Sequence, residues 1–150
     1  MTYTTDFHKV SKDAFCRFIT KISDDFVPPL LPRIDIDDYY AKLKSLATIV
    51  VCIDERNIVG LAATYCNNRD TKLAYTTLVG VDKDYRGRHI ATKLMEKTKV
   101  CAKQSGMKKI GIHTNNPHAR ELYLKCGFTQ VWGGHSSDIQ TERYYLEIEL

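Results

Sequence analysis

The sequence predicts an α/β fold, with a mixed central sheet of about six to seven strands and about four helices. Three segments rich in β-branched and apolar residues follow one another without a helical pattern between them, as neighbouring antiparallel strands do: 48–54, 58–65 and 74–81. A helical pattern then separates the third of these strands from a fourth, which is the order of a right-handed β-α-β crossover with parallel strands. Antiparallel strands followed by a crossover indicate a mixed sheet.

The N-terminal part of the chain begins with a predicted short strand at Thr2–His8. Two amphipathic helices follow, because apolar residues recur at helical spacing over 14–22 and again over 36–46. Ser11 and Asp35 are the expected N-caps of these two helices. A proline-rich stretch separates them.

The central strands have clear boundaries. The turn-like residues 55–57 lie between 48–54 and 58–65, so these two strands are predicted to form a hairpin. The strand at 74–81 follows a polar loop. The helix at 90–104 has apolar residues on one side and mainly charged residues on the other, so one face packs against the sheet.

The last third supplies the crossover strand at 109–113 and a short helix. Asn116 is its expected N-cap, Pro117 takes the first helical position, and Gly127 follows its C-terminus. Two further strands are predicted to close the sheet, 129–132 and 143–150.

Composition limits the classes of function. A chain of 150 residues that is 43% hydrophobic can bury a core, so residues 1–150 are predicted to form one domain. The polar N-terminus and the lack of a 20-residue apolar run predict a cytoplasmic protein without a membrane partner. A net charge of +4 is low for a nucleic-acid binder but suits a polyanionic small molecule, so no nucleic-acid partner is expected. The five cysteines lack metal-ligand spacing, so no metal is expected.

The segment 81–91 has the features of a phosphate-binding loop. It runs from a strand end through Gly87 to a helix start, where free backbone N–H groups and the positive end of the helix dipole favour an anion. Arg86 and Arg88 add positive charge. Neither the Rossmann glycine pattern nor the P-loop pattern occurs in the chain.

This loop resembles the acetyl-CoA loop of the GNAT acetyltransferases, [QR]-x-x-G-x-[GA], with Arg86 first and Ala91 last. A second block at 116–128 is similar to that family's N-x-x-A-x-x-L-Y-x-K-x-G-F. The resemblance covers residues 58 to about 128. It implies the GNAT fold, with the sheet splayed between the fourth and fifth strands, and an acetyl-CoA-dependent N-acetyltransferase that needs no metal.

The resemblance also assigns cofactor-binding residues. It implies that the backbone amides of Val79 and Val81 pair with the pantetheine arm and that Asn116 contacts it. The pyrophosphate loop then comprises six consecutive residues: Arg86, Gly87, Arg88, His89, Ile90 and Ala91. Gly80 fits either a strand bulge at the splay or a packing gap.

Two positions leave alternatives open. Tyr123 matches the family tyrosine that protonates the departing CoA thiolate, although helical spacing would equally place it in the core. His89 stands where the family has a glycine. Its side chain could point to solvent, donate a hydrogen bond to a phosphate, or weaken cofactor binding.

The sequence indicates the general base less clearly than the general acid. The strand at 74–81 lacks the glutamate that many relatives place there, which leaves His113 as the candidate base, or simply as a histidine at a strand end. His135 and Asp138 are weaker candidates. The resemblance places the acceptor site at residues 25–33, at 39–40 and in a loop at 133–141 between the last two strands. The expected acceptor residues are Phe26, Tyr39 and Tyr75. Four aspartates could attract a cationic amine, but helix capping and solvation explain them equally well: Asp24, Asp25, Asp37 and Asp38.

These residues predict direct transfer of an acetyl group to a primary amine of a small molecule, such as an amino sugar, or of a peptide. The alternative is a GNAT-fold module that senses CoA or binds proteins and has little or no catalytic activity. A homodimer is the default expectation for the oligomeric state.

Overall fold

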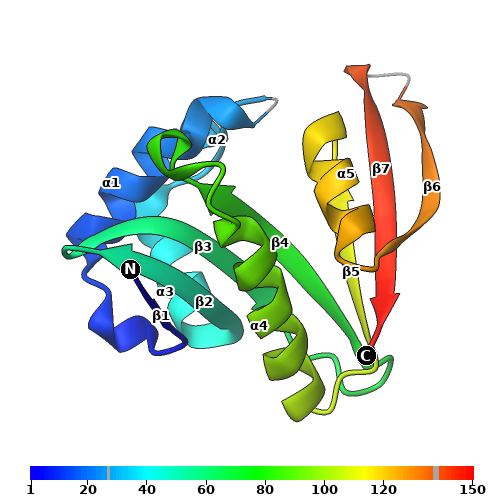
Figure 1. Ribbon diagram of the computed structural model, residues 1–150, viewed down its shortest axis with the longest axis horizontal. Helices are drawn as coiled ribbons and strands as arrows, with labels where there is room; N and C mark the ends of the chain where they lie inside the picture. The colour runs from blue at the N-terminus through cyan, green and yellow to red at the C-terminus, as the bar shows by residue number, and fades with distance from the viewer. Residues whose placement is uncertain (27, 137–138) are drawn as a thin grey trace.

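The computed structural model describes residues 1–26, 28–136 and 139–150, and these form one mixed sheet of seven strands in the order β1-β2-β3-β4-β5-β7-β6 (Figure 1). The strands are β1 (Thr2–Thr4), β2 (Ala47–Asp54), β3 (Asn57–Tyr65), β4 (Leu73–Val81), β5 (Lys109–Thr114), β6 (Thr129–Ser136) and β7 (Ile139–Glu149). The α-helices are α1 (Lys12–Ile22), α2 (Leu30–Arg33), α3 (Ile36–Leu46), α4 (Ile90–Gln104) and α5 (Pro117–Lys125). The predicted α/β fold is confirmed.

Three local features differ from the sequence-based expectation. The predicted first strand ends at Thr4, because the Asp6 side chain accepts a hydrogen bond from the His8 N–H and starts a 3₁₀ turn. In the expected loop at 133–141, β6 continues to Ser136 and β7 already begins at Ile139, so both strands extend past their predicted ends. The proline-rich stretch contains the unpredicted helix α2, whose Leu31 N–H donates to the Ser23 hydroxyl at 2.8 Å.

Helices cover both faces of the sheet. Helices α1 and α3 share a buried cluster with Ile49 and Val51 of β2, whereas α4 packs on the opposite face with Val50. Gly60 of β3 permits the close approach of α4, since a Cβ there would lie 2.7 Å from Ile90 Cγ2. Among the described residues, no helix has the length and apolar character required to cross a bilayer.

The sheet opens between β4 and β5, as expected. Parallel pairing joins only Leu73–Thr76 to Lys109–Ile112, and beyond these residues the two strands diverge (Figure 1). The opening begins at a β-bulge: Ala63 of β3 pairs with Leu78 and Thr64 pairs with Thr76, which leaves Thr77 unpaired. A bulge bends its strand and increases its twist, so Thr77 directs the rest of β4 away from β5.

Gly80 therefore does not mark the bulge. A Cβ at Gly80 would lie 2.5 Å from Ile22 Cδ1, so this glycine makes room for α1 against the sheet. Gly80 thus lies neither at the bulge nor beside a packing gap, but where α1 packs closely on β4.

Asp82 fixes the loop that connects β4 to α4. Its carboxylate is buried, receives the Lys21 ammonium of α1 at 2.7 Å, and accepts the Asp84 N–H at 2.9 Å. Burial alone would raise the pKa of Asp82, but the hydrogen bonds from Lys21 and from the Asp84 N–H outweigh burial and hold it below its ordinary value. The loop is thus tied to α1.

We expect Asp82→Asn to destabilise the protein by about 1–2 kcal/mol at pH 7, because the substitution removes the buried carboxylate that Lys21 contacts. The folded-state pKa is lowered, so this stabilisation is present above the unfolded-state value and is lost as the pH falls below about 4. Thermal melts of both proteins at pH 7 and pH 3 measure the difference. Asp70→Asn in an exposed loop is the matched control, and equal melting temperatures at pH 7 would contradict the assignment.

Candidate active site

Two clefts meet where β4 and β5 separate. The first, the α4–α5 cleft, has a volume of about 590 Å³ and is lined by the end of β4, the start of α4 and one side of α5. The second, the α2 cleft, has about 490 Å³ and is lined by β4, β5 and the segment around α2. The residues common to both are Asp25, Val79, Gly80, Val81, Arg86, Asn116, Ala119 and Tyr123. A ligand in one cleft would therefore contact the walls of the other.

Helix α4 begins in the α4–α5 cleft without a side-chain cap. Side chains of Ser11, Asp35 and Asn116 accept a backbone N–H at the starts of α1, α3 and α5, but His89 makes no such bond at the start of α4. No side chain therefore competes for the first-turn N–H groups of this 15-residue helix, and the helix dipole adds partial positive charge there. These are the features of an anion site.

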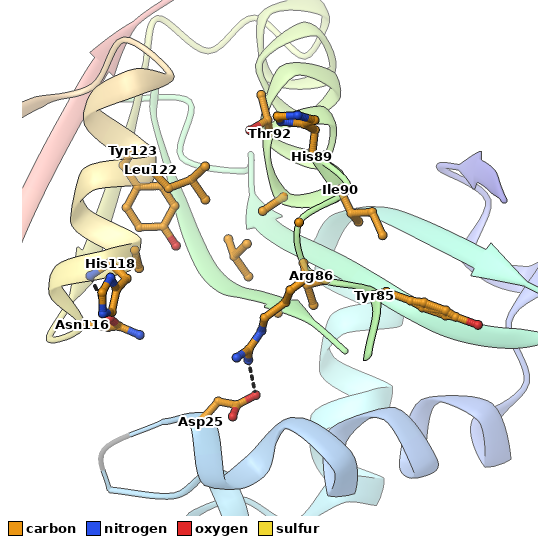
Figure 2. A pocket seen from close by; sticks show the side chains of 16 residues that line it. Asp25, Tyr85, Arg86, His89, Ile90, Thr92, Asn116, His118, Leu122 and Tyr123 are labelled. Atoms are coloured by element: carbon orange, nitrogen blue, oxygen red, sulfur yellow. Dashed lines mark hydrogen bonds and ion pairs between the residues drawn. The ribbon is translucent and has the colours of Figure 1, made fainter. Parts of the chain in front are cut away.

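His89 adopts a left-handed conformation, with φ of 59° and ψ of 25°. This is the glycine position of the resembled motif, and glycine occupies this region without steric cost. A glycine at this position would therefore adopt the observed left-handed conformation without strain. Figure 2 shows the His89 ring beside Thr92 at the start of α4.

The two loop arginines point in different directions. Arg86 lines both clefts and forms an ion pair with Asp25 at 2.7 Å (Figure 2). Arg88 does not line either cleft, because its guanidinium lies over the Tyr85 ring, 5.0 Å from the centroid. The Tyr85 hydroxyl is held by Asp54 at 2.7 Å. Of the predicted loop residues, Arg88 is thus the one whose side chain lies outside the cleft.

The free edge of β4 faces the opening. The Asp82 N–H donates to the Val59 carbonyl of β3 at 2.9 Å, and successive N–H groups of an extended strand point to alternate sides. The N–H groups of Val79 and Val81 are therefore directed away from β3, toward the gap where β5 no longer pairs. An extended ligand with amide groups could pair with this edge as an added strand.

Tyr123 lies at the junction of the two clefts. Its ring is buried in the cluster that includes Phe128, at 5.9 Å between ring centroids, as its core-packing interpretation requires. Its hydroxyl nevertheless points into the α4–α5 cleft (Figure 2). Burial raises the pKa of Tyr123, so the phenol stays protonated at neutral pH.

The predicted acceptor residues and the candidate base line the α2 cleft together: Phe26, Tyr39, Tyr75 and His113. The Tyr75 hydroxyl lies 2.8 Å from His113 Nδ1, and the Tyr145 ring lies 4.6 Å from the imidazole. Burial and, secondarily, the charge of Arg143 lower the pKa of His113, so the imidazole is neutral at pH 7. A neutral imidazole can accept a proton.

Of the four aspartates that could attract a cationic amine, one lines the clefts. Asp25 lines both clefts, whereas Asp37 pairs with Lys12 at 2.9 Å and Asp24 and Asp38 line neither. Asp138 falls outside the described residues, as does the side chain of His135. In the described ranges, no group of three or more His, Cys, Asp or Glu side chains could hold a metal ion.

Two arginines also line the α2 cleft: Arg33, which ends the expected acceptor segment 25–33, and Arg143, which sequence reasoning missed. Arg33 is held in place by the carbonyls of Pro28 and Pro29, at 2.8 and 2.9 Å. The position of Arg143 depends on the register between β6 and β7, which no local pattern encodes.

A family model described as "Acetyltransferase (GNAT) domain" matches residues 45–130. No curated protein sequence matches the chain. Among solved structures, an aminoglycoside 6′-N-acetyltransferase complexed with coenzyme A is 12% identical, with a TM-score of 0.80 over 99% of this chain and 97% of that chain. The ribosomal-protein-S18-alanine N-acetyltransferase from Escherichia coli is 13% identical, with a TM-score of 0.76 over 99% and 92%. The protein yncA from Salmonella typhimurium, with its cofactor acetyl-CoA, is also 13% identical, with a TM-score of 0.77 over 99% and 93%. Identities of this size show a shared fold.

We expect His89→Gly to stabilise the protein by about 0.5–1 kcal/mol, because glycine adopts the left-handed conformation without strain. Arg88→Gly is the matched control: Arg88 has no positive φ, so added backbone freedom there should not stabilise the fold. Thermal or denaturant unfolding measures both. A lower stability of His89→Gly would show that the histidine side chain contributes more than its backbone conformation costs.

Proposed function

Because the chain belongs to the GNAT acetyltransferase family, we propose that it transfers an acetyl group from acetyl-CoA to a primary amine of a small molecule or peptide. The observation that carries this proposal is the position of Tyr123, which lines both clefts and directs its hydroxyl into the α4–α5 cleft. A proton donor is useful at that junction, since a thiolate leaves one ligand as an amine from the other attacks.

The α4–α5 cleft fits acetyl-CoA. The uncapped start of α4 and Arg86 suit the pyrophosphate, and the N–H groups of Val79 and Val81 suit the amides of the pantetheine arm. The coenzyme A and acetyl-CoA named for two structures of the same fold support this assignment. Asn116 lines the same cleft while its side chain caps α5, so its contact with the arm is proposed for its remaining donors.

The chain's own residues can handle both protons of the reaction. Acetyl-CoA supplies an acetyl group activated as a thioester. His113 removes a proton from the bound ammonium, directly or through water, so that the nitrogen lone pair can form the new N–C bond. As the C–S bond breaks, Tyr123 donates its proton to the departing sulfur. The nitrogen loses its second proton as the amide forms, and this proton restores the Tyr123 phenol, directly or through water, while His113 releases the first proton to solvent. The products are the acetylated amine and CoA thiol, and no covalent enzyme intermediate is required.

We expect Tyr123→Phe to lower kcat by about 100-fold or more, because it removes the general acid but retains the buried ring. Thiol release from acetyl-CoA, measured against a panel of primary amines, gives kcat, and calorimetry gives the acetyl-CoA Kd, which should be little changed. Tyr40→Phe is the matched control, since its hydroxyl bonds to Val10 outside both clefts.

Two outcomes would contradict the proposal in different ways. Full activity in Tyr123→Phe would remove Tyr123 from the mechanism but leave the enzyme. Acetyl-CoA binding by the wild type without thiol release on any amine would favour the CoA-sensing or protein-binding module.

The pH dependence tests His113 separately. Burial and Arg143 lower its pKa, so we expect wild-type kcat to fall only as the pH drops below the ordinary histidine value of about 6.5. His113→Asn should show a lower kcat and should lack this acidic limb. His8→Asn, outside both clefts, is the control, and an unchanged limb in His113→Asn would exclude His113 as the base.

A further inference from the structure

The α2 cleft is positively charged. Three arginines line it, together with a single carboxylate in the described part of the chain, that of Asp25. Asp25 is already paired with Arg86 at 2.7 Å. Arg33 and Arg143 therefore bring two guanidinium groups to the cleft that no described carboxylate neutralises.

Arg33 and Arg143 differ in how far their guanidinium groups are already engaged by the protein. Arg33 uses its Nε and one Nη for the carbonyls of Pro29 and Pro28, which hold the guanidinium at the cleft wall but leave its charge unbalanced. Arg143 lies on β7 opposite Gly134 of β6 and forms no ion pair within the described residues. Within this part of the chain its charge is therefore available to a ligand.

Arg143 also lies near the candidate base, because it precedes Tyr144, which pairs with Thr114, the residue after His113, and both Arg143 and His113 line the α2 cleft. A ligand whose anionic group binds Arg143 would hold its amino group near His113. The opposite wall of the cleft is apolar and includes Phe26, Leu30 and Ile34. The cleft therefore offers an anion site, a proton acceptor and an apolar surface.

We propose that the acceptor is an amine that also carries an oxyanion, and that Arg143 binds this oxyanion with support from the charge of Arg33. This inference rests on the proposed acetyl transfer. A guanidinium matches the two oxygens of a carboxylate in a bidentate arrangement, and an α-amino acid with an apolar side chain combines all the required groups. A phosphate on an amino sugar presents the same chemistry.

Electrostatics separates such acceptors from simple cationic amines. A polyamine or unmodified amino sugar brings only positive charge toward the guanidinium groups, and this repulsion opposes its binding. An amine with its own oxyanion enters with little net charge. The arginines then also favour loss of the ammonium proton, which produces the nucleophile.

The first test compares matched acceptors on the wild-type enzyme. Thiol release is measured for leucine against leucinamide, phenylalanine against phenylalaninamide, and glucosamine 6-phosphate against glucosamine. Because amidation lowers the pKa of the amine, kcat/KM is compared at its pH-independent limit. We expect the oxyanion-bearing member of at least one pair to be preferred by about tenfold or more, and the preferred pair identifies carboxylate or phosphate.

The second test is Arg143→Gln, with Arg69→Gln in an exposed loop as the matched control. Arg143→Gln should remove most of the preference by raising KM for the oxyanion-bearing acceptor, while KM for the partner that lacks the oxyanion stays the same or falls, because one repulsive charge is removed. Equal kcat/KM within every pair, or a preference unchanged in Arg143→Gln, would overturn the inference even though acetyl transfer continues. No thiol release with any amine would instead overturn the proposed function, so the two failures are distinguishable.

Discussion

The short parallel pairing between β4 and β5 is the constraint on which the site depends. Four residues of each strand pair, after which the Thr77 bulge bends β4 away while β5 continues beside β7. Two parallel strands that paired along their full length would have satisfied the N–H groups of Val79 and Val81 and left no gap. The separation leaves an unpaired strand edge between two helices, and α4 and α5 form the walls of the resulting cleft.

The same opening divides the site into two electrostatic environments. On the α4–α5 side, positive potential comes from backbone N–H groups at the start of a helix, which are fixed and cannot be titrated. On the α2 side, it comes from arginine side chains contributed by two distant segments of the chain. Tyr123 lies between them with a neutral hydroxyl, because burial opposes its ionisation.

Local signals in the sequence were sufficient for most of the fold. The caps at Ser11, Asp35 and Asn116, the turn before β3 and the helical pattern of α4 each involve a few neighbouring residues, and all occur as expected. The motif residues Arg86 and Tyr123 also come together in one cleft. The bulge at Thr77 and the position of Arg143 were not predictable, because strand register determines them. The extension of β6 to Ser136 and of β7 back to Ile139 was missed, because the glycines and polar residues there are typical of a loop.

The ion pair between Arg86 and Asp25 gives the protein an anion of its own at the entrance to the candidate phosphate site. An external anion that binds Arg86 must displace Asp25 or share Arg86 with it. The measured binding free energy of this anion is therefore reduced by the free energy of the ion pair between Arg86 and Asp25. Exposed ion pairs contribute about 0–1 kcal/mol, which limits this internal competition to about fivefold in Kd. Displacement would leave Asp25 as an unpaired negative charge on the wall shared by both clefts, so that filling one cleft changes the charge presented to a ligand in the other.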